Sequence, residues 1–363
     1  MLFLWDVDGD KPVIWIMSER IKIISIGGGW VVNNRHIPSL LKNPKFELIG
    51  VISDELKRAE HTAEKFKIKN YANEIKLDSG WQSEADAVVI GTVPRVHYDI
   101  AKSALENGKH VLTEKPMVID PAQGRDLRDR AQTKKLILAV VHNFQFARAA
   151  HQFRDDFANG RIGKIQAIYG VQLCNHARHI PAWCDELPLG LFFDEAPHFY
   201  YLFRWLAGGD IELLQASVWK STEKKNTPRM ITGEYQAASG FPLYLHINFA
   251  SSLTEWHVTV VGDKGTADID VWRDIYVYLP NDGSHSAKDI LRTSLYSTFQ
   301  HLWGVWTGGF RYVMGRHLYG NPEVQDRFYR AIRGEDSLQG MNADEGIRVV
   351  EMMHELIQRA VMH

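Results

Sequence analysis

Cysteine, long runs of one charge and long apolar runs are all scarce in this sequence, and each scarcity excludes a class of protein. Only Cys174 and Cys184 occur among 363 residues, so disulfide bonds do not organise the fold, and a reducing, cytoplasmic location is expected. Lys+Arg total 42 and Asp+Glu total 44, a formal net charge of −2. This balance predicts neither a nucleic-acid partner nor a membrane-surface partner. No stretch approaches the length of a membrane span.

The beginning of the chain carries no recognisable signal. Residues 1–16 start apolar, but Asp6, Asp8 and Asp10 interrupt them, which is unlike the continuous apolar core of a signal peptide. We expect this segment to be a disordered, dispensable extension or a start-site artefact. From Met17 onward the sequence is long enough for two domains, and it shows no internal repeat or low-complexity segment.

Residues 85–116 are predicted to form a strand, a helix and a second strand. Residues 87–90 are a short apolar run typical of a buried parallel strand, and residues 97–107 repeat apolar positions at helical spacing before Gly108. Residues 111–113 form the next strand and lead directly into Lys115. A lysine at the carboxyl end of a parallel strand lies where open α/β sheets bind ligands, whereas a lone Lys-Pro would favour an ordinary surface turn.

The segment 108–116 reads GKHVLTEKP and closely resembles the G-K-H-V-x-x-E-K-P signature of the glucose–fructose oxidoreductase / inositol dehydrogenase family (Gfo/Idh/MocA). Similarities to this family extend from about residue 21 almost to the C-terminus. The resemblance implies an α/β fold, with an N-terminal Rossmann domain and a C-terminal α+β domain that has a large open, mostly antiparallel sheet. It also implies a nicotinamide cofactor.

A glycine-rich turn follows the first predicted strand, residues 21–26. Such a turn lets the backbone approach a pyrophosphate at a helix N-terminus. Gly27 and Gly29 fit the G-x-G-x-x-G fingerprint, but Val32 replaces its third glycine. A side chain at this position is expected to loosen the packing between the strand and the helix. Taken alone, these glycines indicate a structural turn as readily as a phosphate site. We predict cofactor contacts from Gly27, Gly29, Trp30 and Val31.

Asp54 follows the second predicted strand, residues 46–52, at the distance where an acidic residue hydrogen-bonds the adenosine ribose. A carboxylate repels a 2′-phosphate, so NAD is favoured. Lys57 and Arg58 could reach a phosphate, so NADP stays open. Asp54 could instead, or in addition, act as the N-cap of the helix at residues 55–66.

The loop 92–97 follows the strand 87–90 and resembles the T-P-N-x-x-H loop of the family, which lies along the nicotinamide half of the cofactor. Thr92 and His97 match that loop, whereas Val93 and Pro94 stand in the Pro and Asn places. The resemblance implies that these residues of the chain also contact the cofactor: Thr92, Pro94, His97, Glu114, Lys115 and Asn143.

The segment 189–209 resembles the family's G-G-x-x-x-D-x-x-x-H stretch, with Leu189 in place of its first glycine. Asp194 and His198 lie four residues apart on one helical face, with Asp194 as the expected N-cap. A carboxylate beside an imidazole can orient it and raise its pKa, which suits proton exchange near neutral pH. We predict catalytic roles for Lys115, His198 and Asp194. A capping aspartate beside a packed histidine is the alternative, and Tyr201 stands where the family often has an aspartate.

The segment 174–184 contains two cysteines and two histidines, Cys174, His176, His179 and Cys184, which raises the question of a zinc site. Their spacing matches no familiar zinc pattern, so we predict no metal. The corresponding family segment runs along the substrate cleft. Expected substrate contacts are therefore His176, Arg178, Trp183, Asp194 and His198.

Strands dominate the second half, which predicts an antiparallel α+β domain at 148–363 after a Rossmann domain at 17–147. The predicted helices are 149–160, 323–334 and 344–361, and the last two can pack back near the Rossmann domain. The predicted strands are 165–174, 213–219, 230–236, 243–249, 257–262, 267–269 and 275–279.

The leading function is an NAD(P)-dependent oxidoreductase that transfers a hydride to or from a secondary alcohol of a sugar, cyclitol or related polyol. The resemblance further implies a homodimer or homotetramer formed through the C-terminal sheet. Two alternatives remain: a cofactor-binding regulatory sensor without turnover, and a cofactor-retaining NAD-dependent glycosidase or dehydratase. The sequence names neither the substrate nor the reaction direction.

Overall fold

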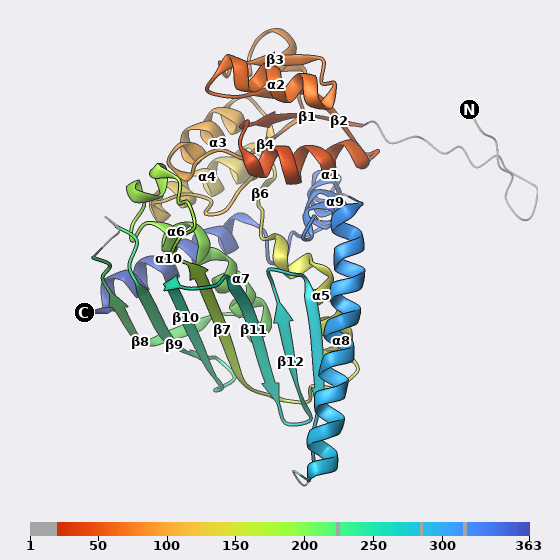
Figure 1. The fold of residues 1–363 in the computed structure, drawn as a ribbon. Helices are drawn as coiled ribbons and strands as arrows, with labels where there is room; N and C mark the ends of the chain where they lie inside the picture. The colour runs from red at the N-terminus through yellow and green to blue at the C-terminus, as the bar shows by residue number, and fades with distance from the viewer. Residues whose placement is uncertain (1–19, 223–225, 284–285, 315–317) are drawn as a thin grey trace, which may run out of the picture.

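The computed structural model describes residues 20–222, 226–283, 286–314 and 318–363, which form two sheets with helices around them (Figure 1). The extension expected at 1–16 lies outside these residues. Within the described residues, no helix is long and apolar enough to cross a membrane.

The first sheet is a parallel Rossmann sheet with strand order β3-β2-β1-β4-β5-β6. The order reverses at β1, which pairs with β2 on one side and β4 on the other, so the loops after β1 and β4 flank a crevice. Its strands are β1 (Ile21–Ile26), β2 (Phe46–Ile52), β3 (Asn70–Ala72), β4 (Ala87–Ile90), β5 (His110–Thr113) and β6 (Leu138–Val140). Its helices are α1 (Ile37–Lys42), preceded by a π-helical turn (Val32–His36), α2 (Leu56–Phe66), α3 (His97–Glu106) and α4 (Pro121–Lys134). Short 3₁₀ turns are Gly80–Glu84, Pro94–Val96 and Asn143–Phe146.

Predicted and observed bounds agree closely in this sheet because its buried strands are short apolar runs between polar loops. The Asp120 carboxylate caps α4 and Pro121 occupies its first turn. Asp54 does not cap α2. The N-cap is Glu55, because helical geometry begins one residue later than expected.

The second sheet has eight strands in the order β13-β12-β11-β7-β10-β9-β8-β14. Most neighbours are antiparallel, but β10–β7 and β14–β8 are parallel, so the sheet is mixed and mostly antiparallel. Its strands are β7 (Ile165–Asn175), β8 (Ile211–Trp219), β9 (Met230–Ala237), β10 (Pro242–Ser251), β11 (Glu255–Gly262), β12 (Gly265–Asp270), β13 (Ile275–Pro280) and β14 (Val361–Met362). The predicted fold class is confirmed.

Helices cover one face of this sheet. They are α5 (Arg148–Ala158), α6 (Leu191–Glu195), α7 (Pro197–Ala207) and α10 (Ala343–Arg359), and a 3₁₀ turn (Ala182–Glu186) precedes α6. The apolar side of α7 is buried over most of its length, and Gly208 ends it in the left-handed region as a C-cap. Along β10 and β11, buried residues alternate with half-buried ones, so the opposite face lacks a helical layer.

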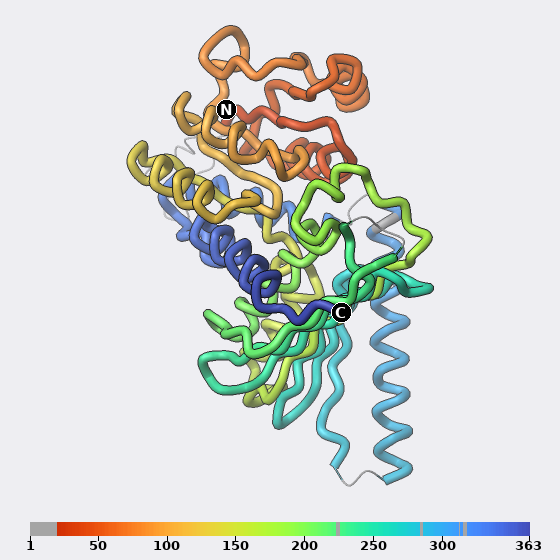
Figure 2. The backbone as a smooth tube through the Cα atoms, turned by 90° about the vertical axis from the view of Figure 1, so that its left-hand side faces the viewer, coloured from red at the N-terminus to blue at the C-terminus, as the bar shows by residue number. Residues whose placement is uncertain are grey.

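The C-terminal helices connect the two sheets. Helix α10 packs on α4, as Figure 2 shows for the dark blue and yellow helices, and it also contacts α7 and β8. Helix α9 (Asn321–Ile332) contributes Val324 and Phe328 to the core on the Rossmann strands. Asn342, the N-cap of α10, bridges to Ala139 in β6. Residues near the C-terminus thus complete the Rossmann core.

The longest helix has no counterpart among the predicted elements. Helix α8 (Ala287–Val313) spans 27 residues and runs along the edge of the second sheet beside β13 (Figure 1). Serine, threonine and glycine interrupt its apolar positions, and these residues are poor helix formers.

Candidate active site

The turn after β1 fits closely against the loop after β4. Gly27 adopts φ +119°, and a Cβ there would lie 2.5 Å from the carbonyl oxygen of Gly91. A Cβ on Gly28 would lie 2.8 Å from Cγ of Arg58. Only glycines allow this approach, and the backbone they expose at the start of a helix is the kind of cradle that accepts a pyrophosphate.

Val32 does not loosen this packing, contrary to the doubt raised by the missing third glycine. Its side chain is fully buried, and a Cβ on Gly91 would lie 2.5 Å from Val32 Cγ2. Gly91 therefore provides the space that the third glycine provides in the fingerprint. The first helix contains its π-helical turn from Val32 to His36 at this same point, which widens the helix locally.

Trp30 and Val31, the other residues predicted here, begin that helix. Trp30 is largely exposed and Val31 is half-buried. The guanidinium of Arg35 lies 5.2 Å from the Trp30 ring centroid. Both predicted residues border the glycine turn, and their contact with a cofactor stays a prediction.

Asp54 follows β2 and is paired with a cation. Its Oδ1 accepts hydrogen bonds from the Ser53 hydroxyl at 3.0 Å and from Nη1 of Arg58 at 2.8 Å. Arg58 also donates to Glu55 at 2.8 Å. Asp54 is expected to favour NAD, and Arg58 could accept a 2′-phosphate. The two side chains therefore neutralise each other's charge.

His97 ties the loop after β4 to the loop after β5. Its buried ring lies between two carbonyl oxygens, Pro116 at 2.9 Å from Nδ1 and Thr92 at 3.1 Å from Nε2. Burial lowers the pKa of His97. Pro94 is buried beside it, and the Thr92 hydroxyl is a buried group without a hydrogen-bond partner among the described residues. An unpaired buried hydroxyl beside the glycine turn fits a polar ligand in the crevice.

Glu114 is buried between the first helix and the Lys115 turn. Its Oε1 lies 2.9 Å from Nε2 of His36, and its Oε2 accepts the backbone N–H of Lys115 at 3.1 Å. Burial opposes ionisation, but the hydrogen bond with His36 and the charge of Lys115 hold the pKa of Glu114 below its ordinary value. Glu114 thus keeps a negative charge beneath Lys115.

Lys115 and Asp194 form a nearly buried ion pair across the two domains. Nζ donates to the Asp194 carbonyl oxygen at 2.8 Å and to its Oδ1 at 3.0 Å, with side-chain exposures of 14% and 21%. Burial alone would lower the pKa of Lys115, but Asp194 and Glu114 raise it above its ordinary value. Lys115 is therefore a cation at neutral pH.

His198 is held by Tyr201 and not by Asp194, which corrects the predicted Asp–His pair. Asp194 lies inside α6, and Ala196, between α6 and α7, is the N-cap of α7, so Asp194 caps no helix. Nδ1 of His198 lies 2.9 Å from the Tyr201 hydroxyl, one turn along α7. The helix is interrupted at Ala196, and Asp194 lies on the Lys115 side of this interruption. Tyr201, three positions after His198, orients the imidazole instead.

The charge state of His198 also differs from the prediction. Its pKa lies well below the ordinary value because the ring is buried and because Lys115 is positively charged. Burial raises the pKa of Tyr201 well above its ordinary value, so its hydroxyl keeps a proton. That hydroxyl also accepts the N–H of Phe144 at 3.1 Å. His198 is therefore a neutral imidazole at neutral pH.

Aromatic rings enclose His198. Phe144 meets it edge-on at a centroid distance of 4.6 Å, and Trp256 lies at 5.6 Å. Tyr319 packs on Phe144 at 5.5 Å and carries the Arg35 guanidinium at 3.8 Å over its ring. These surroundings exclude water from the ring and explain its low basicity.

Asn143 reaches a different partner from the one predicted for it. Its amide donates to the Tyr319 carbonyl oxygen at 2.8 Å and so fixes the segment before α9. Contact between Asn143 and a cofactor stays a prediction.

The segment predicted to contact substrate is only partly free to do so. The Arg178 guanidinium donates to Glu195 Oε1 at 2.6 Å, and Nδ1 of His176 lies 3.1 Å from the Ser251 carbonyl oxygen. Trp183 is half-buried against the core. Arg178 thus links this segment to α6 through an ion pair with Glu195. The substrate roles of His176, Arg178 and Trp183 stay predictions.

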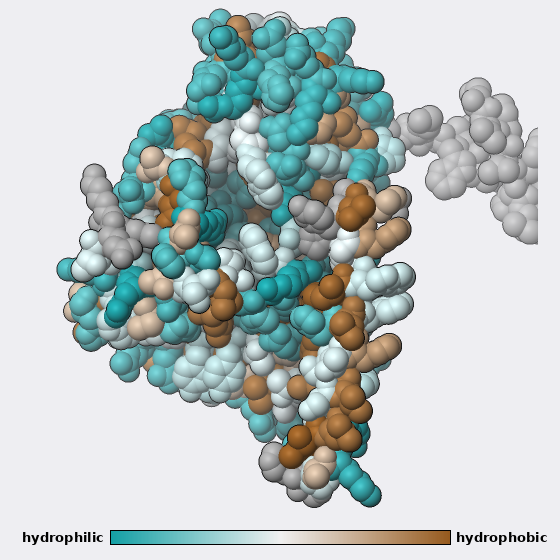
Figure 3. All heavy atoms as spheres, viewed as in Figure 1, coloured by the Kyte–Doolittle hydropathy of each residue, from teal (hydrophilic) through white to brown (hydrophobic). Residues whose placement is uncertain are grey.

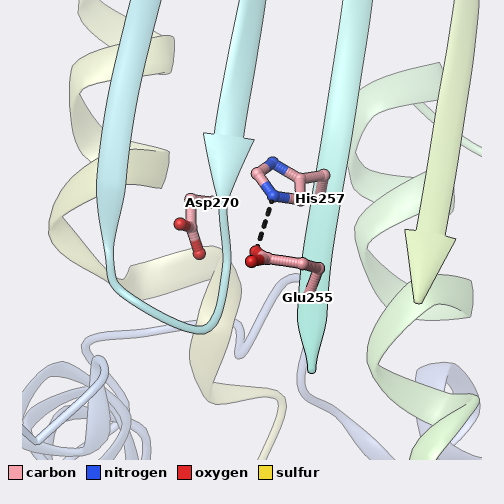
Figure 4. Close-up of side chains that lie close together, drawn as sticks. All are labelled: Glu255, His257 and Asp270. Carbon is pink, nitrogen blue, oxygen red and sulfur yellow. Dashed lines mark hydrogen bonds and ion pairs between the residues drawn. The ribbon is translucent and has the colours of Figure 1, made fainter. Parts of the chain in front are cut away.

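Cys174 and Cys184 are buried and are not joined in a disulfide bond. Among the described residues, the one grouping with metal-like spacing lies elsewhere, on β11 and β12: Glu255, His257 and Asp270 (Figure 4). Arg273 already bridges Glu255 and Asp270, with Nη1 2.8 Å from Asp270. The Asp268 hydrogen bond raises the pKa of His257 to about 9. The guanidinium of Arg273 and the protonated His257 ring lie where a metal ion would bind, and they already neutralise the carboxylates. The cluster is therefore an ion-pair network.

Sequence reasoning missed Tyr201 as the partner of His198, and it missed Phe144, Trp256 and Arg35 around it. Tyr201 left a signal, since it stands three residues after the histidine, where a helix brings side chains together. The other three come from distant elements, and only the tertiary structure assembles them.

Two family models match the chain. Residues 21–142 match the oxidoreductase family with NAD-binding Rossmann fold (GFO_IDH_MocA), and residues 150–268 match the GFO/IDH/MocA C-terminal domain. D-glucoside 3-dehydrogenase of Escherichia coli is 30% identical over 152 residues, 41% of this chain and 42% of that protein. 1,5-anhydro-D-fructose reductase of Ensifer adhaerens is 26% identical over 187 residues, 50% of this chain and 56% of that protein. The chain thus matches only about half of the length of these relatives, or less.

Solved structures share the fold at low identity. The WlbA dehydrogenase from Bordetella pertussis, in complex with NADH and UDP-GlcNAcA, has a TM-score of 0.74 and 19% identity, covering 94% of this chain and 96% of that one. GenD2 from gentamicin A biosynthesis, in complex with NAD, has a TM-score of 0.73 and 18% identity, covering 95% and 94%. The two consecutive family models, matching residues 21–142 and 150–268, establish that this chain belongs to the Gfo/Idh/MocA oxidoreductase family.

Proposed function

We propose that this protein is an NAD(P)-dependent oxidoreductase that transfers a hydride to or from a secondary alcohol of a sugar, cyclitol or related polyol. One observation carries the proposal: cationic Lys115 and neutral, Tyr201-held His198 lie together beside the crevice of a Rossmann sheet. The names of the relatives support the substrate class, because they refer to a D-glucoside and an anhydro-fructose.

The crevice fits a dinucleotide cofactor. The Gly27 turn leaves no room for a Cβ, and the Thr92 hydroxyl is buried without a partner among the described residues. We assign the pyrophosphate to the turn at Gly27 and Gly29, the ribose to Asp54, and the nicotinamide half to the loops of Thr92 and Lys115. A bound nicotinamide dinucleotide would supply or accept the hydride.

Lys115 polarises the reacting oxygen in this proposal. Its ammonium group has three N–H donors, and two of them point to Asp194. The third donates to the substrate oxygen, where the positive charge stabilises a developing alkoxide. Asp194 is then a positioning residue, because it orients the ammonium group and keeps it protonated.

His198 exchanges the proton. As a neutral imidazole it can accept the proton of a substrate hydroxyl in the oxidation direction. The Tyr201 hydroxyl can donate to Nδ1 or accept from it, so it holds the ring in either tautomer. His176, Arg178 and Trp183 are proposed to line the sugar side of the site.

The function is tested first with freshly purified full-length protein. Mass spectrometry identifies any bound cofactor or sugar, and absorbance of the reduced nicotinamide then follows turnover across a panel of sugars, sugar nucleotides and cyclitols. Cofactor binding with turnover of a polyol supports the proposal, and failure to bind either dinucleotide contradicts it. Binding without turnover on the whole panel indicates the regulatory sensor. A co-purified cofactor that is regenerated in each cycle indicates the cofactor-retaining glycosidase or dehydratase.

The assembly and location belong to the same proposal. The face of the second sheet opposite its helices carries the exposed Tyr169 and the half-buried Tyr244, stacked at 5.2 Å, which suit a subunit interface. We propose a cytoplasmic homodimer or homotetramer that uses this face. Light scattering coupled to gel filtration measures the assembly, and a monomer would contradict it.

A further inference from the structure

Helix α8 packs on the protein through its polar side. Gln300 bonds to both the N–H and the carbonyl oxygen of Tyr278, and the Thr307 hydroxyl accepts from Arg148 at 2.6 Å. A Cβ on Gly304 would lie 2.6 Å from Ile275, so the helix fits closely against β13. A surface helix normally turns its apolar side inward, and this one is reversed.

Large apolar side chains point outward along nearly the whole of α8, which spans about 40 Å. Figure 3 shows brown spheres following the helix along the edge of the molecule. Phe299 and Trp306 are 68% and 67% exposed. The outer apolar face consists of Leu291, Leu295, Tyr296, Phe299, Leu302, Trp303, Trp306, Phe310, Val313 and Met314.

The size of this face is unusual for a surface in contact with water. Its five aromatic side chains are 42–68% exposed, and at about 200 Å² each they alone leave on the order of 600 Å² uncovered. The largest apolar patch on a typical monomer is about 300–600 Å², and larger ones mark sites that bind protein or membrane.

The charges around this face decide between those two partners. Between Arg292 and Arg311 the helix carries no Asp, Glu, Lys or Arg. Helical spacing places Lys288 and Arg292 on the same face as Leu295 and Phe299, at one end of it, where Arg292 also pairs with the less exposed Asp289 at 3.5 Å. An apolar band with cations at its end matches a bilayer with anionic headgroups, because the apolar groups enter the acyl boundary while the cations reach the phosphates.

A second copy of the chain matches this charge pattern less well. A two-fold pairing with parallel α8 helices would bring Lys288 and Arg292 against the same residues of the other copy. An antiparallel pairing would press them against apolar Val313 and Met314. Both arrangements place cations where their charge is unfavourable.

We propose that α8 docks this protein onto the surface of a lipid bilayer that contains anionic phospholipid, with the helix lying in the interface. The formal charge of −2 gives no sign of such a site. No continuous apolar run marks it either, because its apolar residues are spread over 24 positions of mixed sequence. The proposal is independent of the substrate that the oxidoreductase acts on.

Flotation of the full-length protein with vesicles tests the proposal. The wild type should float with vesicles of equimolar phosphatidylcholine and phosphatidylglycerol, and less with phosphatidylcholine alone. Phe299→Ser with Trp306→Ser should weaken binding by more than about tenfold, because each removes apolar area that the bilayer would cover. A control, Leu56→Ser with Leu253→Ser, changes two exposed leucines away from α8, 49% and 45% exposed, and should bind like the wild type.

A second variant examines the electrostatic part and does not depend on the apolar residues. Lys288→Glu with Arg292→Glu should reduce binding to phosphatidylglycerol vesicles by more than about tenfold, since each cation near an anionic surface contributes about fivefold. Thermal melting checks that every variant is folded. Wild type that floats with neither vesicle, or a Phe299/Trp306 variant that floats unchanged, overturns the proposal. A dimer that this variant dissociates, without vesicle binding, assigns the face to a second copy instead.

Discussion

Lys115 and His198 lie close together, the one a cation and the other neutral, and this difference makes their roles separable by experiment. Asp194 and Glu114 raise the pKa of Lys115, while burial and then the Lys115 charge lower that of His198. Lys115→Ala and His198→Asn should each reduce turnover by roughly 10²–10⁴-fold. Both should still bind NAD, since neither holds the adenosine half. Steady-state rates and cofactor titrations measure this, and near-normal turnover in both variants would contradict the assignment.

The coupling between these two groups gives a pH prediction at the same scale. Because the pKa of His198 is depressed, its ring should stay neutral from pH 8 down through its ordinary value of about 6.5. Lys115→Met removes the cation but keeps the aliphatic stem, so the pKa of His198 should rise. Imidazole resonances in NMR spectra, assigned with His198→Asn, follow the titration. Lys109→Met, a buried lysine at the other end of β5, is the control and should leave it unchanged. A wild-type midpoint at 6.5 or above would refute the depressed pKa.

We expect the Asp54–Arg58 ion pair to govern cofactor choice. Asp54→Ser should release Arg58 for a 2′-phosphate and improve NADP binding by about 10- to 100-fold, the range of one charge-assisted hydrogen bond. Arg58→Ala added to Asp54→Ser should remove that gain. Fluorescence titrations with both reduced dinucleotides measure the change. Tighter binding of NADP than NAD by the unmodified protein would show that Arg58 and Lys57 dominate.

At the residue scale, sequence patterns located the charged groups but not all of their contacts. Lys115 was predictable because the end of a parallel strand is read directly from the chain. The partner of Asp194 was not, because it depends on where α6 ends and α7 begins, a boundary of one residue, Ala196. The low pKa of His198 was not predictable either, since it arises from the burial of the ring among aromatic residues of three other segments.

Among the elements, the first βα unit shows how one lost glycine is compensated elsewhere. Gly91→Ala should destabilise the protein by about 1–3 kcal/mol, because its Cβ would overlap Val32 Cγ2. Val32→Ala removes that methyl group, so the double variant should be about 1–2 kcal/mol more stable than the sum of the single changes predicts.

Urea unfolding without cofactor measures this cycle. Gly29→Ala is the control in the same turn, because its added Cβ meets no atom within 4 Å, and it should change stability by less than about 0.5 kcal/mol. Strict additivity of Gly91→Ala and Val32→Ala would mean that the helix shifts away and that Gly91 does not stand in for the missing glycine.

The elements differ in how far local sequence determines them. The strands of both sheets were predicted, apart from β14 at the C-terminus, because buried strands are apolar runs bounded by polar loops. Residue 361 was expected to end the last helix, but it begins the exposed strand β14. Helix α8 was not, because its inward positions, such as Gln300, Gly304 and Thr307, are polar or small and its apolar positions face outward. A pattern search for a buried apolar stripe fails on a helix whose apolar side faces outward.

The whole molecule depends on contacts between distant parts of the chain, and one such contact couples its stability to pH. His142 follows β6, stacks on Tyr201 at 4.5 Å, and has Nδ1 2.9 Å from the Gly340 carbonyl oxygen just before α10. It therefore sits where the Rossmann sheet, α7 and the C-terminal segment meet. Burial lowers its pKa to about 4. The folded state holds this ring neutral across the range in which an unfolded histidine takes up a proton.

Stability should consequently fall as the pH drops from about 6.5 to about 4, because the unfolded chain then binds more protons than the folded one. His142 alone accounts for ~3 kcal/mol over this range, and buried His97 and His198 act in the same direction. On the alkaline side, His257 has the opposite effect on stability. Its pKa is raised to about 9 in the folded state, so its protonated ring stabilises the fold fully below pH 6.5, and this contribution is lost as the pH rises through 9. Urea unfolding between pH 4.5 and 9 should give a maximum near neutrality. His142→Gln keeps a donor for Gly340 but cannot titrate, so its acid-side slope should be clearly shallower; equal slopes in the two proteins would place the acid sensitivity elsewhere.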